Sequence, residues 1–206
     1  MENKTPFMTE IPEQEPQRQQ YFMAHAKEQL HILEENLGRP LTCCINTFGC
    51  QMNARDSEKL LGILETIGYQ AVETEDADFV LYNTCTVREN ANLRVYGRLG
   101  QLGARKKKHP HMMIALCGCM MQEKEVVEKI KKTYRFVDLI FGTHNIFKLA
   151  ELVSICLEER LEELEAQGRE DKKPKHKMVV DVWKDTDQIV EDLPVSYTHL
   201  TLPTKA

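Results

Sequence analysis

Three cysteines, Cys50, Cys85 and Cys119, stand where an apolar run ends and a helical pattern begins. Cysteine thiolates are soft ligands that select zinc, copper(I) or iron–sulfur clusters. A helix N-terminus lowers the pKa of a nearby thiol and so favours the thiolate that a metal binds. The three residues are 35 and 34 positions apart, far wider than the spacing of a Cys-x-x-Cys zinc ribbon. They can share a metal only if the fold brings the three junctions together.

The apolar runs before these cysteines predict strands, and the periodic stretches after them predict helices. The predicted strands cover residues 41–48, 69–73, 79–83, 112–116 and 137–141, and residues 178–183 form one more, either on an edge or in a following domain. Helices are predicted over residues 18–37 and 53–68, and three more follow Thr86, the fourth strand and Gly142. Asn53 is expected to cap the second helix, and Thr86 with Glu89 has the form of a capping box.

Strands that alternate with helices at this spacing indicate βαβ units and a parallel sheet. We expect an α/β fold with about five strands flanked by helices, flavodoxin-like or Rossmann-like, with an N-terminal helical extension. Right-handed crossovers place every strand-to-helix turn on one edge of such a sheet, and ligands bind beyond the carboxyl ends of the strands. The three cysteines are therefore expected to meet on one rim.

The residues alone leave three alternatives open: an iron–sulfur cluster, a zinc site, or no metal. A structural zinc site takes four protein ligands, and His144 at the next junction is a candidate for the fourth. A [4Fe–4S] cluster held by three cysteines leaves one iron open for a ligand or substrate.

Four runs, TFGCQMNARDSEKL, NTCTVRENA, ALCGCMMQ and VDLIFGTHNIFKL, resemble the N-terminal domain of the radical-SAM methylthiotransferases. The resemblance covers about residues 41–195. The motif around Cys50 reads GCQMN, which is similar to the tRNA branch that acts on N6-(dimethylallyl)adenosine. The enzyme that modifies a ribosomal protein typically has GCPKN there, and the threonylcarbamoyladenosine enzyme has GCKVN.

The resemblance implies that Cys50, Cys85 and Cys119 hold an auxiliary [4Fe–4S] cluster, which supplies or carries the inserted sulfur. Asn53, close to Cys50, is a candidate for a hydrogen bond to a ligand. Asn83 and Arg88 flank Cys85 and are candidates for the same role or for contact with a cofactor. His144 is then a residue at a helix start rather than a ligand.

The implied reaction converts N6-(dimethylallyl)adenosine next to the anticodon of tRNA to its 2-methylthio derivative with S-adenosylmethionine. The family's second [4Fe–4S] cluster, which cleaves S-adenosylmethionine, needs a CxxxCxxC motif, and this sequence has none. The family has that motif shortly after the position of Asp192, where this chain continues as VSYTHLTLPTKA. We therefore expect that the radical-SAM domain is missing and that this chain alone is inactive.

These observations divide the chain into four parts. They are an extension (1–40, partly disordered and then helical), the methylthiotransferase N-terminal domain (41–166), a linker with an edge strand (167–195) and a non-native tail (196–206). The alternative to the methylthiotransferase interpretation is a non-catalytic zinc-binding or interaction module with a flavodoxin-like fold. The colour of anaerobically purified protein separates the two, because a [4Fe–4S] protein is brown.

The remaining cysteines are predicted to be structural. Cys43 and Cys44 are adjacent in one strand, so they point to opposite faces of the sheet. Cys156 lies in the last long helix. Cys117 is two residues before Cys119 and is the less favoured alternative ligand. The basic run over residues 105–109 is expected to solvate a helix C-terminus, where cations are favoured, with contact to RNA phosphate as the alternative.

Composition limits the class of protein. The 206 residues carry 27 basic and 32 acidic side chains, a net charge of −5, so the whole chain lacks the positive field of a dedicated nucleic-acid binder. The N-terminus has no signal-peptide pattern, and no apolar run approaches the roughly 20 residues of a membrane helix. We expect a cytoplasmic monomer that does not bind membranes and that contacts tRNA within the full-length enzyme.

Overall fold

The sheet at the centre of the structure contains six parallel strands. The structure is a computed structural model and describes residues 11–85, 89–166 and 176–182. The strands are β1 (Thr42–Phe48), β2 (Gln70–Ala71), β3 (Phe79–Thr84), β4 (Met113–Gly118), β5 (Leu139–Phe141) and β6 (Val179–Asp181), in the spatial order β2-β1-β3-β4-β5-β6. The first five follow the flavodoxin-like order, which reverses direction between β1 and β3. The fold prediction is confirmed, with six strands instead of about five.

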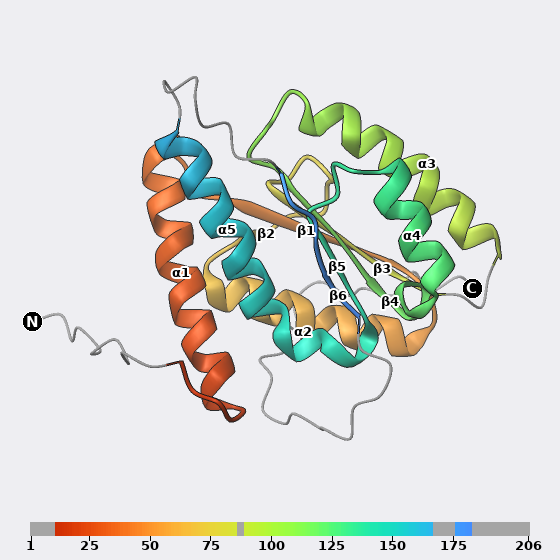
Figure 1. Cartoon of the computed structure of the whole chain (residues 1–206), viewed down its shortest axis with the longest axis horizontal. Coiled ribbons are helices and arrows are strands. Elements are labelled where there is room, and N and C mark those ends of the chain that lie inside the picture. Colours follow the sequence, from red (N-terminus) through yellow and green to blue (C-terminus); the bar gives the residue numbers. More distant parts are fainter. Residues whose placement is uncertain (1–10, 86–88, 167–175, 183–206) are drawn as a thin grey trace, which may run out of the picture.

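Helices cover both faces of this sheet (Figure 1). The α-helices are α1 (Gln17–Leu37), α2 (Gln51–Ile67), α3 (Glu89–Lys106), α4 (Lys124–Thr133) and α5 (Leu149–Glu165). Two short 3-10 helices, η1 (Cys119–Gln122) and η2 (Thr143–Lys148), precede α4 and α5. One face of the sheet packs against α1, α2 and α5, and the other packs against α3 and α4.

Alternating side chains of the strands build one core on each face. Every residue of β3 and β4 is buried, as expected for parallel strands that helices cover on both sides. Cys43 belongs to the core under α1, α2 and α5, and Cys44 to the core under α3 and α4, so their predicted division between the faces is confirmed. The N-terminal helix α1 packs mainly on α5 and buries Leu30 and Leu33 in the first of these cores.

Two predicted element starts are corrected. Helix α2 begins at Gln51, so the residue that caps it is Cys50 and not Asn53, which is the third residue of the helix. The helix predicted from Gly142 begins as the 3-10 helix η2, and α5 follows it. The last predicted strand is β6, which pairs with β5 on the edge of the same sheet, the first of its two predicted positions.

Several predictions lie outside the described residues. They concern Arg88, the Thr86 end of the capping box, most of the linker, and the tail from Ser196. In the parts that are described, no helix is long and apolar enough to cross a membrane.

Candidate metal centre at the strand ends

The three predicted ligands follow three neighbouring strands. Phe48, Thr84 and Gly118 are register partners at the ends of β1, β3 and β4. Cys85 and Cys119 come directly after two of these residues, and Cys50 comes two residues after Phe48. Neighbouring strands are about 4.8 Å apart, so the register brings the three cysteines to one rim. Cys50 and Cys85 flank the point where the strand order reverses, where ligands bind in folds of this kind.

Cys50 is exposed and stands at the N-terminus of α2. Its backbone N–H donates to Asn53 Oδ1 at 3.3 Å, and its thiol lies 3.2 Å from the same oxygen. The backbone N–H groups of Asn53 and Met52 lower the pKa of the Cys50 thiol, and a hydrogen bond with the Cys85 side chain adds to this effect. The helix start therefore favours the thiolate, the form that binds metals.

Cys85 and Cys119 are less accessible than Cys50. Cys85 is buried, and its side chain meets that of Cys50. Cys119 is half-buried, and its Sγ lies 3.6 Å from the carbonyl oxygen of Thr84. The same oxygen accepts a hydrogen bond of 3.3 Å from Asn53 Nδ2. One carbonyl thus links the residue that supports Cys50 to the thiol of Cys119.

A buried amide pair lies behind the thiols. Asn53 Nδ2 donates to Asn83 Oδ1 at 3.0 Å, and Asn83 Nδ2 donates to the Asn53 carbonyl oxygen at 2.8 Å and to Ser57 Oγ at 3.0 Å. Ser57 Oγ is also 2.7 Å from Thr47 Oγ1 on β1. These bonds join α2, β1 and β3, so they fix the rotamers of both asparagines. Asn53 and Asn83 therefore lie beside the cysteines that are predicted to be ligands.

Two glycines allow the backbone to come close to the asparagine side chains. Gly118 has a φ of 102°, and a Cβ there would lie 2.1 Å from the Thr84 carbonyl oxygen and 2.7 Å from Asn83 Oδ1. A Cβ on Gly49 would lie 2.5 Å from Asn53 Oδ1. Both contacts are closer than real Cβ atoms permit, so each position requires glycine. The backbone before Cys50 and the backbone before Cys119 therefore depend on the same amide pair.

The donor set suits a thiolate-bound metal group. It offers three cysteines, one of which has a lowered pKa, next to hydrogen-bond donors that can face the sulfurs. Across the residues that the structure describes, no cluster of three or more His, Cys, Asp and Glu side chains is close enough to hold a single metal ion. His144, the alternative fourth ligand, is exposed in η2, which follows the next strand, β5.

The other four cysteines are buried. Burial raises the pKa of Cys43 to about 12 and that of Cys44 to about 11, and it also raises the pKa values of Cys117 and Cys156. A buried thiol in apolar surroundings is inert. Cys117 lies inside β4 as the register partner of Asn83, away from the exposed rim.

The sequence analysis did not predict that Ser57, Thr84 and Gly118 contribute to the site. Only the pairing between the strands could have indicated them, because Thr47, Asn83 and Cys117 are register partners across β1, β3 and β4. Sequence reasoning also misplaced Lys106 in the basic run: this side chain is only partly exposed and bonds to Asp138 and to the carbonyl oxygen of Phe136. Lys107, Lys108 and His109 are exposed, as predicted.

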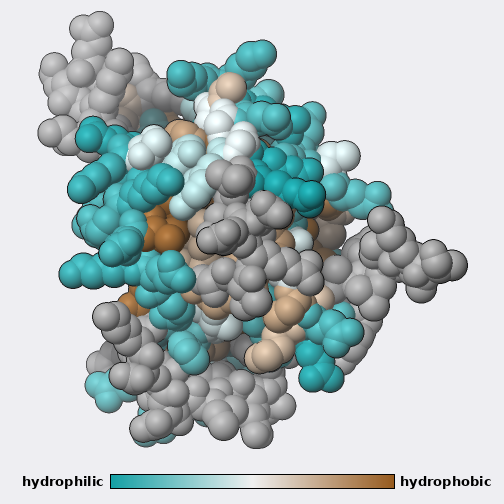
Figure 2. All heavy atoms as spheres, turned by 90° about the vertical axis from the view of Figure 1, so that its right-hand side faces the viewer, coloured by the Kyte–Doolittle hydropathy of each residue, from teal (hydrophilic) through white to brown (hydrophobic). Residues whose placement is uncertain are grey.

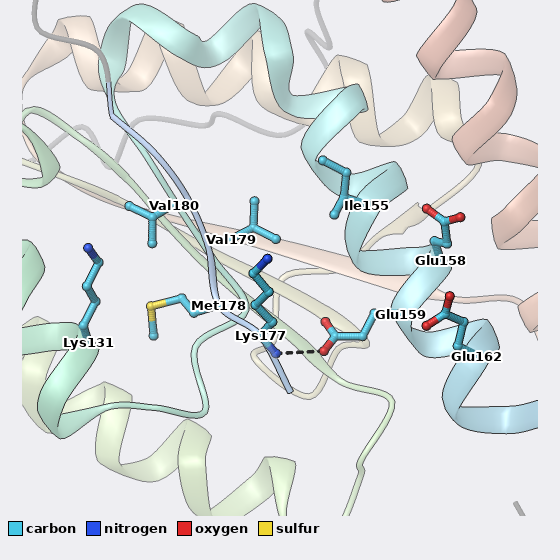
Figure 3. Close-up of a pocket in the computed structure, with 9 residues that line it drawn as sticks. All are labelled: Lys131, Ile155, Glu158, Glu159, Glu162, Lys177, Met178, Val179 and Val180. Atoms are coloured by element: carbon cyan, nitrogen blue, oxygen red, sulfur yellow. Dashed lines mark hydrogen bonds between the residues drawn. The ribbon is translucent and has the colours of Figure 1, made fainter. Parts of the chain in front are cut away.

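Of the three rim cysteines, Cys50 is the exposed one. Figure 2 shows the side of the molecule toward which β1, β3 and β4 run, and most of the described surface visible there is hydrophilic. A separate groove lies beside β6, between α4 and α5 (Figure 3). Its lining includes Glu158, Glu159 and Glu162 and none of the three cysteines.

The comparisons with known proteins give a consistent result. Residues 42–142 match the family described as "Uncharacterized protein family UPF0004". The chain is 63% identical over 172 residues to the tRNA-2-methylthio-N(6)-dimethylallyladenosine synthase of Lachnoclostridium phytofermentans, an alignment that covers 84% of this chain and 34% of that protein. Proteins of the same name from Acetivibrio thermocellus and Clostridioides difficile are 45% and 43% identical over 90% and 89% of this chain, and 35% of each is covered.

The chain spans about a third of the length of these curated relatives. The predicted motifs around Cys50, Cys85 and Cys119 all fall within the matched family segment. The resemblance carried by four short runs therefore extends over most of the chain, and this chain belongs to the methylthiotransferase family.

Proposed function

We propose that this chain is the cluster-binding domain of a cytoplasmic tRNA methylthiotransferase, with Cys50, Cys85 and Cys119 as the ligands of a [4Fe–4S] cluster. One observation carries the proposal: three thiols follow three register-aligned strand ends, and one of them has a lowered pKa at a helix N-terminus. The names of the relatives supply the substrate, tRNA that carries N6-(dimethylallyl)adenosine.

The chain's own residues would hold and orient the cluster. The N–H groups at the start of α2 stabilise the Cys50 thiolate. The Asn53–Asn83 pair fixes the position of α2 relative to β3, so it sets the distance between Cys50 and Cys85. The Gly118 backbone places Cys119 against the Thr84 carbonyl. When bound, the cluster would provide the sulfur that the reaction inserts, while the adenosyl radical needs a second cluster and S-adenosylmethionine.

The test is anaerobic reconstitution of the chain with iron and sulfide. The unaltered chain should take up about four irons and four sulfides, the content of a [4Fe–4S] cluster. Cys50→Ala, Cys85→Ala and Cys119→Ala should each lose most of this content, because a missing thiolate leaves one iron without its protein ligand. Iron and acid-labile sulfide are measured per chain, together with the visible absorption.

Two further cysteine variants are the controls. Cys117→Ala and Cys156→Ala should keep their iron and sulfide, since both thiols are buried away from the rim. Full iron uptake by Cys85→Ala would contradict the ligand assignment. Uptake of zinc without sulfide by the unaltered chain would instead support a zinc-binding or interaction module.

A second test concerns activity. The sequence lacks CxxxCxxC, so the reconstituted chain, given S-adenosylmethionine, a strong reductant and tRNA with N6-(dimethylallyl)adenosine, should form neither 5′-deoxyadenosine nor 2-methylthio product. Detection of 5′-deoxyadenosine above the control without protein would show that this chain builds a second cluster from its other cysteines.

A further inference from the structure

The helices on the two faces of the sheet carry opposite charge. On one face, α3 and α4 contain eight basic and three acidic residues, a net charge of +5. On the other face, α1, α2 and α5 contain five basic and twelve acidic residues, a net charge of −7. The net charge of the whole chain, −5, therefore hides a positive layer next to a negative one.

Much of the positive charge on the α3–α4 face is available to a partner. Arg94 on α3 and Lys124 and Lys132 on α4 are exposed, and so are Lys107 and Lys108, which directly follow α3. Within the described parts of the chain, none of these five side chains forms an ion pair. Gly97 and Gly100 lie on the exposed side of α3, and a Cβ there would meet nothing within 4 Å. A partner can therefore approach the backbone of α3 closely between its cationic side chains.

The positive face is continuous with the cysteine rim. Helix α3 begins four residues after Cys85, and α4 begins five residues after Cys119. Both helices run from the rim toward the opposite edge of the sheet (Figure 1). The 18 residues of α3 give a length of about 27 Å, so a polyanion along this face would have one part at the rim and several phosphates along the helices.

The sheet edge between the two faces does not suit the same partner. The groove beside β6 has Glu158, Glu159 and Glu162 on its α5 side, with Lys131 of α4 and Lys177 as its cations (Figure 3). Lys177 already donates its backbone N–H to Glu159 at 2.8 Å. Phosphate groups would be repelled from this groove, so charge complementarity selects α3 and α4.

We propose that the exposed face of α3 and α4 binds the phosphate backbone of the RNA substrate and directs the RNA toward the cysteine rim. That the polyanion is RNA rests on the proposed function. That it binds to α3 and α4 rests on the opposite charges of the two faces. Lysine and arginine that neutralise phosphates release counterions, so the contact should be strongly salt-dependent.

The test measures binding of a fluorescein-labelled RNA hairpin with an anticodon stem-loop sequence to the 206-residue chain without metal. Fluorescence anisotropy is recorded from about 50 to about 200 mM salt, where phosphate contacts change affinity steeply. Two double variants remove charge from the face: Arg94→Gln with Lys124→Gln near the rim, and Lys107→Gln with Lys108→Gln at the far end of α3. The matched control is Lys27→Gln with Lys59→Gln on α1 and α2.

Each double variant should make the slope of log K against log salt less steep by about 1.4 to 1.8 and weaken binding by more than about tenfold. The control should keep the slope and affinity of the unaltered chain. Failure of the unaltered chain to bind at about 50 mM salt would overturn the proposal, and so would an equal loss in the control. The same variants should still take up the full content of iron, because none of the substituted residues is a predicted ligand. Loss of RNA binding and failure of the cluster assignment are therefore measured in separate experiments.

Discussion

At the edge where the strands begin, carboxylates join neighbouring strands, whereas at the edge where the strands end, neutral amides and hydroxyls do so. Asp78 and Asp138 each stand directly before a strand, β3 and β5, and each accepts a backbone N–H from the preceding neighbour in the sheet. Asn83 at the end of β3 bonds to Asn53 and Ser57 of α2, Ser57 also bonds to Thr47 of β1, and the Thr84 hydroxyl donates to the Cys117 carbonyl oxygen of β4. The two edges therefore use different chemistry for the same mechanical task.

The two edges differ in which groups are buried and which are exposed to solvent. Asp138 is buried and is paired with Lys106 and Arg160, so its charge is neutralised inside the protein. The strand ends instead keep Cys50 exposed, with its pKa lowered. A fixed carboxylate beside the thiols would oppose their ionisation. Neutral amides hold the rim in place without that penalty, so the buried ion pairs and the exposed thiol lie at opposite edges of the sheet.

Loss of the buried carboxylate should give the largest effect. Asp138→Asn leaves Lys106 and Arg160 without their common partner, and removing one member of a buried ion pair costs about 3–5 kcal/mol. The free energy of unfolding, measured with urea by circular dichroism, should fall by that amount. Asp76→Asn, at an exposed position, should change it by less than about 0.5 kcal/mol. Similar values for the two variants would show that the strand-start edge is not held by charge.

Gly118→Ala tests whether the rim also carries stability. The alanine must adopt a φ of 102° and meet the Thr84 carbonyl, so strain and overlap should together cost about 2–4 kcal/mol. Gly100→Ala is the matched control, since its Cβ meets nothing and alanine is the better helix former, and it should stabilise by about 0.5–1 kcal/mol. A neutral Gly118→Ala would mean that the rim backbone adapts freely, contrary to the proposed fixed geometry.

Much of this contrast could be predicted from the sequence, and the remainder depends on tertiary contacts. Alternating apolar runs and helical patterns predicted the strands and placed Cys50, Cys85 and Cys119 on one rim. The capping of α2 by Cys50 was missed because cysteine is an unusual cap, and because the reciprocal bond comes from Asn53 within the helix. Local pattern predicted Asn53 as the cap and as a hydrogen-bond partner near Cys50, but it gave no information on the bonds of Asn53 to Asn83 and Thr84.

The charged edge was not predictable in the same way. Lys106 lies in a basic run that reads as solvated, yet Asp138 lies opposite it in space, 32 residues later in the chain. The local sequence does not predict the Lys106–Asp138 pair, because the pair forms only when α3 packs beside the start of β5. Ser57, Thr84 and Gly118 escaped for a related reason: their contacts depend on the register between strands.

Arg39 allows a smaller and pH-dependent test of the strand-start edge. Burial raises the pKa of Asp78, but hydrogen bonds from Arg39 and the Thr42 backbone outweigh it, so the net pKa is below its usual value. The stabilisation from Asp78 is therefore present at neutral pH, above the unfolded pKa of about 3.9, and is lost as the pH falls through the lower folded pKa.

Arg39→Gln should destabilise by up to about 1 kcal/mol at pH 7, because Arg39 is half exposed and solvent screens the pair. The difference from the unaltered chain should shrink as Asp78 is protonated below about pH 4. Urea unfolding at several pH values measures both quantities. Lys27→Gln, at another exposed cation, should show no such trend, and a constant difference at every pH would contradict the role of Asp78.

The smallest expected change in stability belongs to Cys50, the position with the largest expected reactivity. Cys50→Ser should alter the free energy of unfolding by less than about 0.5 kcal/mol, because the side chain is exposed and serine is a good helix cap. Cys156→Ser puts a hydroxyl into the core and should cost about 1–3 kcal/mol.

In the metal-free chain, one thiol should react with iodoacetamide much faster than the others, and Cys50→Ser should remove that fast phase. Its rate should rise with pH to a midpoint below the usual thiol pKa of about 8.5, because the thiolate is the nucleophile. A fast phase that persists in Cys50→Ser would show that the activated thiol is another cysteine, and the exposed Cys50 thiol would then not be what distinguishes the strand-end edge from the charged edge.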